Sequence, residues 1–198
     1  IIDFETKGLD ILGEEFDVVG VGVSNEQYPN GIYCALSSES YEVVVNTLFQ
    51  YSLVAFNVGF DGKVLEWMSQ KVGNQPMSHW PWIGDALILY KQLTSEGWDG
   101  QGWTLKEAQK LVLGWPETNE VLLDAWLIDN DFRKGSKKAP KPDKSQMWRA
   151  PRPILGHYCA LDCQSTLLLW NHFKTYWVQF PELGLLGSRE FSRLAKLE

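Results

Sequence analysis

Three short apolar segments near the start of the chain restrict its fold more than any other feature. Ile1–Thr6 is rich in β-branched residues, Phe16–Val23 is a nearly continuous apolar run, and Ile32–Leu36 follows the turn-forming dipeptide Asn30-Gly31. Runs of this length, bounded by glycine and turn residues, are typical of β-strands. We therefore predict that the chain begins with a three-stranded antiparallel meander.

Strand-length and helix-length patterns alternate after this meander. We expect strands at Leu53–Phe56 and Trp80–Gly84, helices at Ser38–Gln50, Phe60–Lys71, Asp85–Leu93, Thr104–Leu113, Asn119–Asp131 and Ile154–Val178 with a short helical tail beyond, and loops at Thr94–Trp103 and Phe132–Pro153. Thr104 and Glu107 have the spacing of a capping box. Strands followed by alternating strands and helices predict an α/β fold, with one mixed sheet flanked by helices.

Length and composition are those of one globular domain. The 198 residues are 44% hydrophobic and 22% charged, which argues against a disordered or collagen-like chain. No apolar stretch approaches the roughly 20 residues of a membrane span. Three cysteines without a secreted spacing indicate free thiols in a reducing compartment, so we expect a cytoplasmic protein without a membrane partner. The chain opens on a strand without Met, and we expect it to be a piece of a longer protein.

The net charge of −7 at first disfavours a nucleic-acid ligand, but the charges are unevenly distributed. Arg133–Arg152 contains eight basic residues and one acid, which gives this segment a charge of +7 against −14 for the rest of the chain. A solvated loop over residues 131–153 would explain such a run. The alternative is an arm that follows phosphates through Lys134, Lys137 and Lys138, with Trp148 available for base stacking.

Four acidic residues fall in positions that suit a metal site. Asp3 and Glu5 alternate on the first strand, so both carboxylates project to one side of it. Asp61 falls in the first turn of the helix after Leu53–Phe56, and Tyr158 and Asp162 share a face of the last helix. Taken singly, the first signal is explained equally well by an exposed strand end. A helix cap is the preferred explanation of the second signal alone, and a structural pair is the usual explanation of the third. Together they offer oxygen ligands, which suit Mg²⁺ or Mn²⁺.

The order of these motifs resembles the DEDD superfamily of 3′–5′ exonucleases, in the subclass that has a tyrosine in the third motif. Asp3-Phe4-Glu5-Thr6-Lys7-Gly8-Leu9 is similar to the first motif of the proofreading domain of a family A DNA polymerase, and Asn57–Asp61 to the second. The resemblance covers nearly the whole chain. It identifies residues 1–198 as one exonuclease domain cut from a longer polymerase chain, although no polymerase motif is present and the basic segment fits no motif.

The resemblance implies a ribonuclease H-like fold and hydrolysis of phosphodiester bonds by two divalent cations, Mg²⁺ or Mn²⁺, at a single-stranded DNA 3′ end. Asp3, Glu5 and Asp162 match the ligands of one cation, Asp3 and Asp61 those of the other, and Tyr158 the residue that orients the attacking water. The residues expected to contact the substrate are Phe4, Thr6, Leu9, Asn57, Phe60, Lys134, Lys137, Lys138 and Trp148. A polymerase domain would be the partner, in cis or in trans.

Two alternative functions remain open on the sequence. A ribonuclease D-like or Werner-like exonuclease, acting on RNA or DNA, has the same four carboxylates and tyrosine. A nucleic-acid-binding module that retains an exonuclease fold without activity is the non-catalytic alternative.

Overall fold

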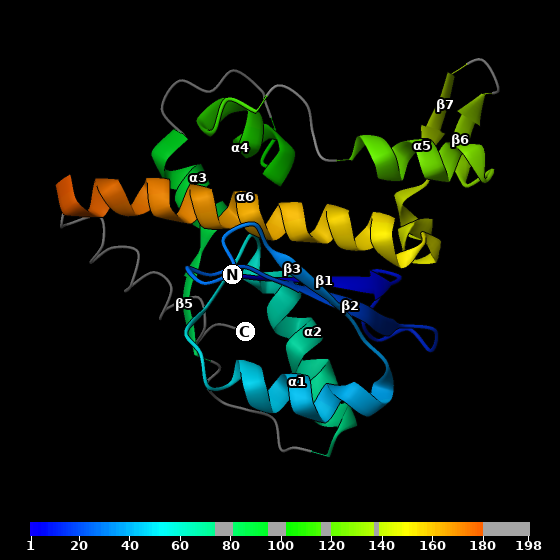
Figure 1. Cartoon of the computed structure of the whole chain (residues 1–198), viewed down its shortest axis with the longest axis horizontal. Coiled ribbons are helices and arrows are strands. Elements are labelled where there is room, and N and C mark those ends of the chain that lie inside the picture. Colours follow the sequence, from blue (N-terminus) through cyan, green and yellow to red (C-terminus); the bar gives the residue numbers. More distant parts are fainter. Residues whose placement is uncertain (74–80, 95–101, 116–119, 137–138, 180–198) are drawn as a thin grey trace.

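A computed structural model describes residues 1–73, 81–94, 102–115, 120–136 and 139–179 (Figure 1). In chain order, the elements are β1 (Ile2–Lys7), β2 (Asp17–Val23), β3 (Ile32–Ala35), the 3₁₀ helix η1 (Ser38–Ser40), α1 (Tyr41–Leu48), β4 (Leu53–Ala55), α2 (Val58–Lys71), β5 (Trp82–Asp85), α3 (Ala86–Thr94), α4 (Leu105–Val112), α5 (Val121–Asp129), β6 (Arg133–Ser136), β7 (Ala139–Pro142), the 3₁₀ helix η2 (Lys144–Arg149) and α6 (Arg152–Gln179). The mixed α/β class is confirmed. Within the described ranges, no helix is both long and apolar enough to cross a membrane.

The N-terminal meander is confirmed. β1 pairs antiparallel with β2, and β2 with β3, with Asp3 opposite Gly22 and Gly22 opposite Tyr33. A register shift between Glu5 and Thr6 interrupts the first ladder directly after the second acid. Such irregularities bend a strand and redirect the side chains beyond it.

The prediction of one mixed sheet is only partly correct. β4 and β5 form a parallel pair that is separate from the meander, and β1 contacts β4 without a ladder among the described residues. A specific contact helps to explain why β1 and β4 form no ladder here: the backbone N–H of Phe4 on β1 donates to Asp61 Oδ1 at 3.0 Å. Because the Asp61 side chain accepts this hydrogen bond, the Phe4 N–H is not available to pair with a neighbouring strand.

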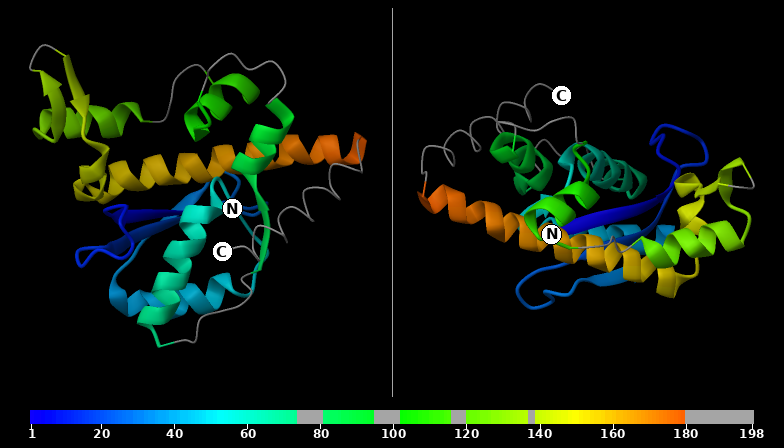
Figure 2. Two further views of the ribbon diagram at one scale, coloured as in Figure 1. Left: turned by 180° about the vertical axis from the view of Figure 1, so that it is seen from behind. Right: turned by 90° about the horizontal axis from the view of Figure 1, so that it is seen from above.

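Helices cover both sides of the strands. α6 runs along one side, with α3, α4 and α5 around it, and α1 and α2 lie on the other (Figures 1 and 2). Close approach of α6 to β5 depends on Gly84, because a Cβ there would lie 2.0 Å from the Trp170 ring. The core comprises one cluster between the meander and α1–α2, a second between β4, α3, α4 and α6, and a third between α5 and the start of α6.

Most helix predictions are correct to within a few residues. The capping box of α4 is present: Thr104 Oγ1 accepts from the Glu107 N–H, and Glu107 Oε2 accepts from the Thr104 N–H. α2 begins at Val58, slightly before the predicted Phe60, and α6 extends beyond both predicted ends. The short tail predicted after Val178, most of the predicted Thr94–Trp103 loop, Lys137 and Lys138 lie outside the described residues.

The prediction of a loop over Phe132–Pro153 is wrong. β6 and β7 form an antiparallel hairpin, and η2 follows it. Prolines are depleted in strands because they lack an N–H donor. Here the Asp143 N–H donates to the Phe132 carbonyl across the hairpin. Because strand donors alternate in direction, Pro140 and Pro142 occupy the outward-facing positions, where no donor is needed.

Candidate metal centre

The first two acids of the site lie on β1. Glu5 is buried and Asp3 is partly buried, and both belong to the side of the strand that faces α6. Phe4 between them is also buried, but it packs into the cluster with α1 and α2. The alternation predicted from the sequence is therefore present, since one strand places two carboxylates toward a helix and a phenyl ring into the core.

The third acid reaches β1 from α2. Asp61 is buried in the first turn of this helix and accepts the Phe4 N–H, which places its carboxylate beside the strand between Asp3 and Glu5. Asp85 fixes the start of α2 by accepting the N–H groups of Asn57 and Val58 at 3.2 and 2.8 Å. Asn57 has a left-handed φ of 99°, so its backbone shapes the entry into α2.

Asp85 has a second role, at the start of α3. Its carboxylate accepts the N–H of Leu87 at 2.8 Å and that of Ile88 at 3.3 Å, so it caps the first turn of α3. One buried carboxylate thus connects the starts of α2 and α3. This link holds Asp61 in place through the helix that carries it.

The fourth acid and the tyrosine lie one turn apart on α6. Asp162 is buried, forms an ion pair with Lys106 of α4 and accepts a hydrogen bond from Gln109 Nε2 at 3.4 Å. Lys106 Nζ also lies 4.6 Å from the centre of the Tyr158 ring. Sequence analysis missed Lys106 and Gln109. Their i, i+3 spacing places them on one face of α4, but nothing in it points to Asp162.

A cavity of about 230 Å³ opens beside these groups. Its walls come from β1, the turn after it, α2, η2 and α6, and its lining residues are Asp3, Phe4, Glu5, Thr6, Gly8, Leu9, Phe60, Lys144, Ser145, Met147, Tyr158 and Asp162. The structure therefore brings together three of the four acids, the tyrosine and four of the expected substrate residues. Asp61 lies beside the strand and is not part of the lining. Sequence analysis missed the contribution of η2.

The acids strongly perturb one another. Burial and the charge of Asp162 raise the pKa of Asp3 to about 7, although Lys106 opposes this shift. Burial raises the pKa of Glu5 well above its usual range, with further contributions from Asp3 and Asp162. The pKa of Asp61 is raised by its own burial and by Asp3. Such a cluster needs protons or cations to offset its repulsion.

Of the remaining expected substrate residues, the three that the structure describes, Asn57, Lys134 and Trp148, do not line the cavity. The side chain of Lys134 on β6 pairs with Asp143 at 2.8 Å, within the hairpin region. Trp148 on η2 has Lys7 Nζ at 5.4 Å and the Arg149 guanidinium at 4.3 Å from its ring centre. The ring that was expected to stack on a base therefore has two cations close to it in this structure. Asn57 acts through its backbone, as described above.

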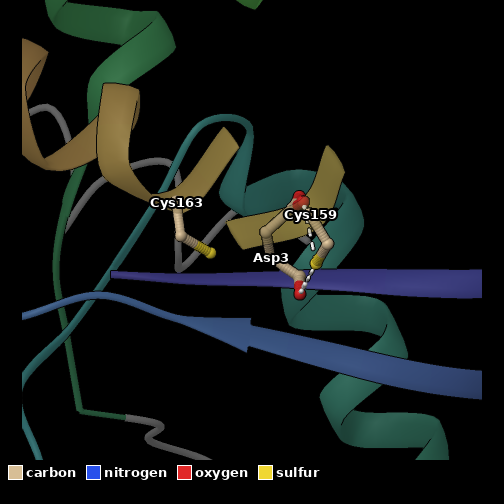
Figure 3. Close-up of side chains that lie close together, drawn as sticks. All are labelled: Asp3, Cys159 and Cys163. Carbon is tan, nitrogen blue, oxygen red and sulfur yellow. Dashed lines mark hydrogen bonds between the residues drawn. The ribbon is translucent and has the colours of Figure 1, made fainter. Parts of the chain in front are cut away.

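The donor set suits a hard cation in its chemistry, because Asp3, Glu5 and Asp162 bring three carboxylates to the lining. The carboxylates are not drawn tightly together, however. Among the described residues, the one trio of His, Cys, Asp or Glu donor atoms within 4.8 Å of one another is Asp3, Cys159 and Cys163 (Figure 3), and sulfur does not suit Mg²⁺. The chain matches no protein-family model, and a search of curated proteins also finds no match.

Proposed function

We propose that this chain is a metal-dependent 3′–5′ exonuclease, which removes nucleotides from the 3′ end of single-stranded DNA and proofreads for a DNA polymerase. The observation that carries this proposal is the meeting of Asp3, Glu5, Asp162 and Tyr158 at one cavity, with Asp61 hydrogen-bonded to the strand between the first two. These residues come from three elements that are far apart in the sequence. Their convergence is what the resemblance to the DEDD exonucleases requires.

The proposal includes a ribonuclease H-like fold. A three-stranded antiparallel meander and a parallel strand pair are both present, and β1 contacts β4. This contact would place the two sheets in one mixed layer. α6 then lies along that layer and carries Tyr158 and Asp162 toward β1.

Raised carboxylate pKa values support a cation site. The negative charges of Asp3, Glu5 and Asp162 repel one another, and divalent cations would relieve that repulsion. Asp3, Glu5 and Asp162 would hold one cation, and Asp3 with Asp61 the other. When bound, two such cations supply a water of lowered pKa and stabilise the departing 3′ oxygen.

Protein groups account for the remaining chemistry. Burial and the charges of Asp162 and Glu5 raise the pKa of Tyr158 well above its usual range, so its hydroxyl stays protonated and orients the attacking water. Thr6 Oγ1 donates to the Gly8 carbonyl at 2.7 Å and shapes the turn that carries Leu9. The Leu9 side chain is 78% exposed at the cavity and would pack against the terminal base.

The same site would serve a ribonuclease D-like or Werner-like exonuclease. Initial rates on DNA and RNA oligonucleotides of identical sequence separate these activities, and we expect faster cleavage of DNA. An inactive nucleic-acid-binding module would bind the oligonucleotides without shortening either one.

The test uses a 5′-labelled single-stranded oligonucleotide with Mg²⁺ or Mn²⁺. We expect products that shorten one nucleotide at a time from the 3′ end. Asp61→Asn should abolish them, and Tyr158→Phe should slow their formation about 100-fold by misplacing the water. Glu42→Gln, which changes an exposed acid on α1, is the matched control and should retain the full rate. Full activity of Asp61→Asn would refute the proposal.

A further inference from the structure

Two thiols point at the acid that is central to the proposed metal centre. Cys159 and Cys163 lie one turn apart on α6, are completely buried, and face Asp3 of β1 (Figure 3). The Cys159 sulfur lies 3.6 Å from both Asp3 Oδ2 and the Asp3 carbonyl oxygen. One carboxylate oxygen and the two sulfurs all lie within 4.8 Å of one another. No part of the proposed exonuclease chemistry uses these thiols.

A glycine on the neighbouring strand makes room for this cluster. Gly22 of β2 lies opposite Asp3 in the ladder. A Cβ at this position would lie 2.6 Å from the Cys163 sulfur and 2.7 Å from the Cys159 sulfur, closer than packed atoms approach. The bare backbone of β2 therefore allows both sulfurs to lie beside the Asp3 carboxylate, and three elements fix their positions.

We propose that Asp3, Cys159 and Cys163 form a binding site for a thiophilic divalent cation such as Zn²⁺. Two sulfurs and one oxygen are a donor set that selects Zn²⁺ over Mg²⁺. In a tetrahedral zinc site, bonds of about 2.3 Å to sulfur and 2.0 Å to oxygen separate those two ligand atoms by roughly 3.5 Å. The 3.6 Å between Cys159 Sγ and Asp3 Oδ2 already matches this separation.

The binding step is balanced by proton release. The Asp3 carboxylate and two thiols bind one Zn²⁺, two sulfur–zinc bonds and one oxygen–zinc bond form, and the two thiol protons pass to solvent. A water completes the coordination. Although the sulfurs are buried, Asp3 also lines the cavity of about 230 Å³, so the cation can reach this carboxylate from solvent before it contacts the sulfurs.

Sharing of Asp3 makes the soft-cation site and the proposed hard-cation site mutually exclusive. A carboxylate turned toward the two sulfurs cannot also bridge two cations with Glu5, Asp61 and Asp162. Zn²⁺ would therefore inhibit cleavage supported by Mg²⁺. This consequence rests on the proposed exonuclease function, whereas Zn²⁺ binding itself does not.

The experiment titrates the intact chain with Co²⁺, which reports sulfur ligands through a charge-transfer band in the near ultraviolet. We expect this band to saturate at one Co²⁺ per chain and to disappear when Zn²⁺ is added. Because the two sites share Asp3, a large excess of Mg²⁺ should raise the Co²⁺ concentration needed for saturation without changing the final intensity of the band. Cys159→Ser and Cys163→Ser should lose the band. Both variants should also bind Zn²⁺ more weakly. Loss of a residue that only supports a metal ligand weakens binding roughly 10- to 100-fold, and loss of a ligand itself should weaken it by more. Cys34→Ser, at the exposed third cysteine, should retain both.

Binding of Co²⁺ to the wild-type chain without this band would overturn the inference, and so would failure to bind Co²⁺ at all. This wild-type result is decisive even if a serine variant fails to fold. The two proposals also fail separately. A sulfur–cobalt band in a chain without nuclease activity removes only the exonuclease, and nuclease activity without the band removes only the thiol site.

Discussion

Replacing Lys106 with methionine should destabilise the metal-free protein and make it depend more strongly on divalent cations. The Lys106–Asp162 pair is largely buried, with side-chain exposures of 17% and 6%. Removing one partner of a buried ion pair costs about 3–5 kcal/mol. We expect the lower end, about 3 kcal/mol at pH 8, because the lysine retains some solvent contact. The cost should fall at pH 6, where Asp3, with a pKa of about 7, is protonated.

Scanning calorimetry in EDTA and in saturating Mn²⁺ measures this effect. In a domain of 150–250 residues, each kcal/mol shifts the melting temperature by about 2–4 °C, so the loss should be about 6–12 °C in EDTA at pH 8. Mn²⁺ supplies the missing positive charge, and the difference between the variant and the wild type should shrink. Lys110→Met, on the exposed face of the same helix, is the control and should change stability by less than about 0.5 kcal/mol. Equal stabilities of Lys106→Met and wild type in EDTA at pH 8 would refute the role of Lys106 in balancing the acids.

Three further predictions concern the site and its surroundings. The pKa of Asp3 in the folded, metal-free chain is about 7, above its unfolded value, so the contribution of Asp3 to stability is full below about pH 4 and is lost as the pH rises to about 7. Urea unfolding in EDTA should show this decline in the free energy of unfolding, and the decline should be smaller in Asp3→Asn. Gly22→Ala should cost about 1–3 kcal/mol in urea unfolding because its methyl overlaps both sulfurs, and no loss would contradict the packing of α6 on β2. Lys134→Gln should lower the salt dependence of single-stranded DNA binding, measured by fluorescence anisotropy, by about 0.7 in log–log slope if this residue contacts a phosphate; an unchanged slope would exclude that contact.

Local patterns made the meander and most helices predictable from the sequence. Strand-length apolar runs, the Asn30-Gly31 turn and the Thr104 capping box each depend on neighbouring residues alone. The hairpin over Arg133–Pro142 was not predictable in this way, because its composition is poor for strands. Its prolines are tolerated because they occupy positions whose backbone N–H would point away from β6, and the pairing with β6 sets which positions these are.

For the site, the sequence could predict which acids share a strand or helix, but not which basic side chain offsets their negative charge. Asp3 and Glu5 follow from strand alternation, and Tyr158 and Asp162 from helix spacing. Lys106 lies on another helix, 56 residues before Asp162 in the sequence, and no local sequence pattern predicts a contact between residues so far apart. The spacing of Cys159 and Cys163 predicts only that the two thiols share a face of α6. Their contact with Asp3 depends on Gly22 of another strand.

Anomalous diffraction at the manganese edge tests the central claim most directly. Crystals would be grown with Mn²⁺ and a deoxynucleoside 5′-monophosphate, the expected product class, because the nucleotide phosphate supplies additional ligands. We predict two manganese peaks, one among Asp3, Glu5 and Asp162 and the other between Asp3 and Asp61. Peaks confined to other parts of the surface, or no peak at these carboxylates under saturating Mn²⁺, would contradict the assignment of this site as a two-cation centre.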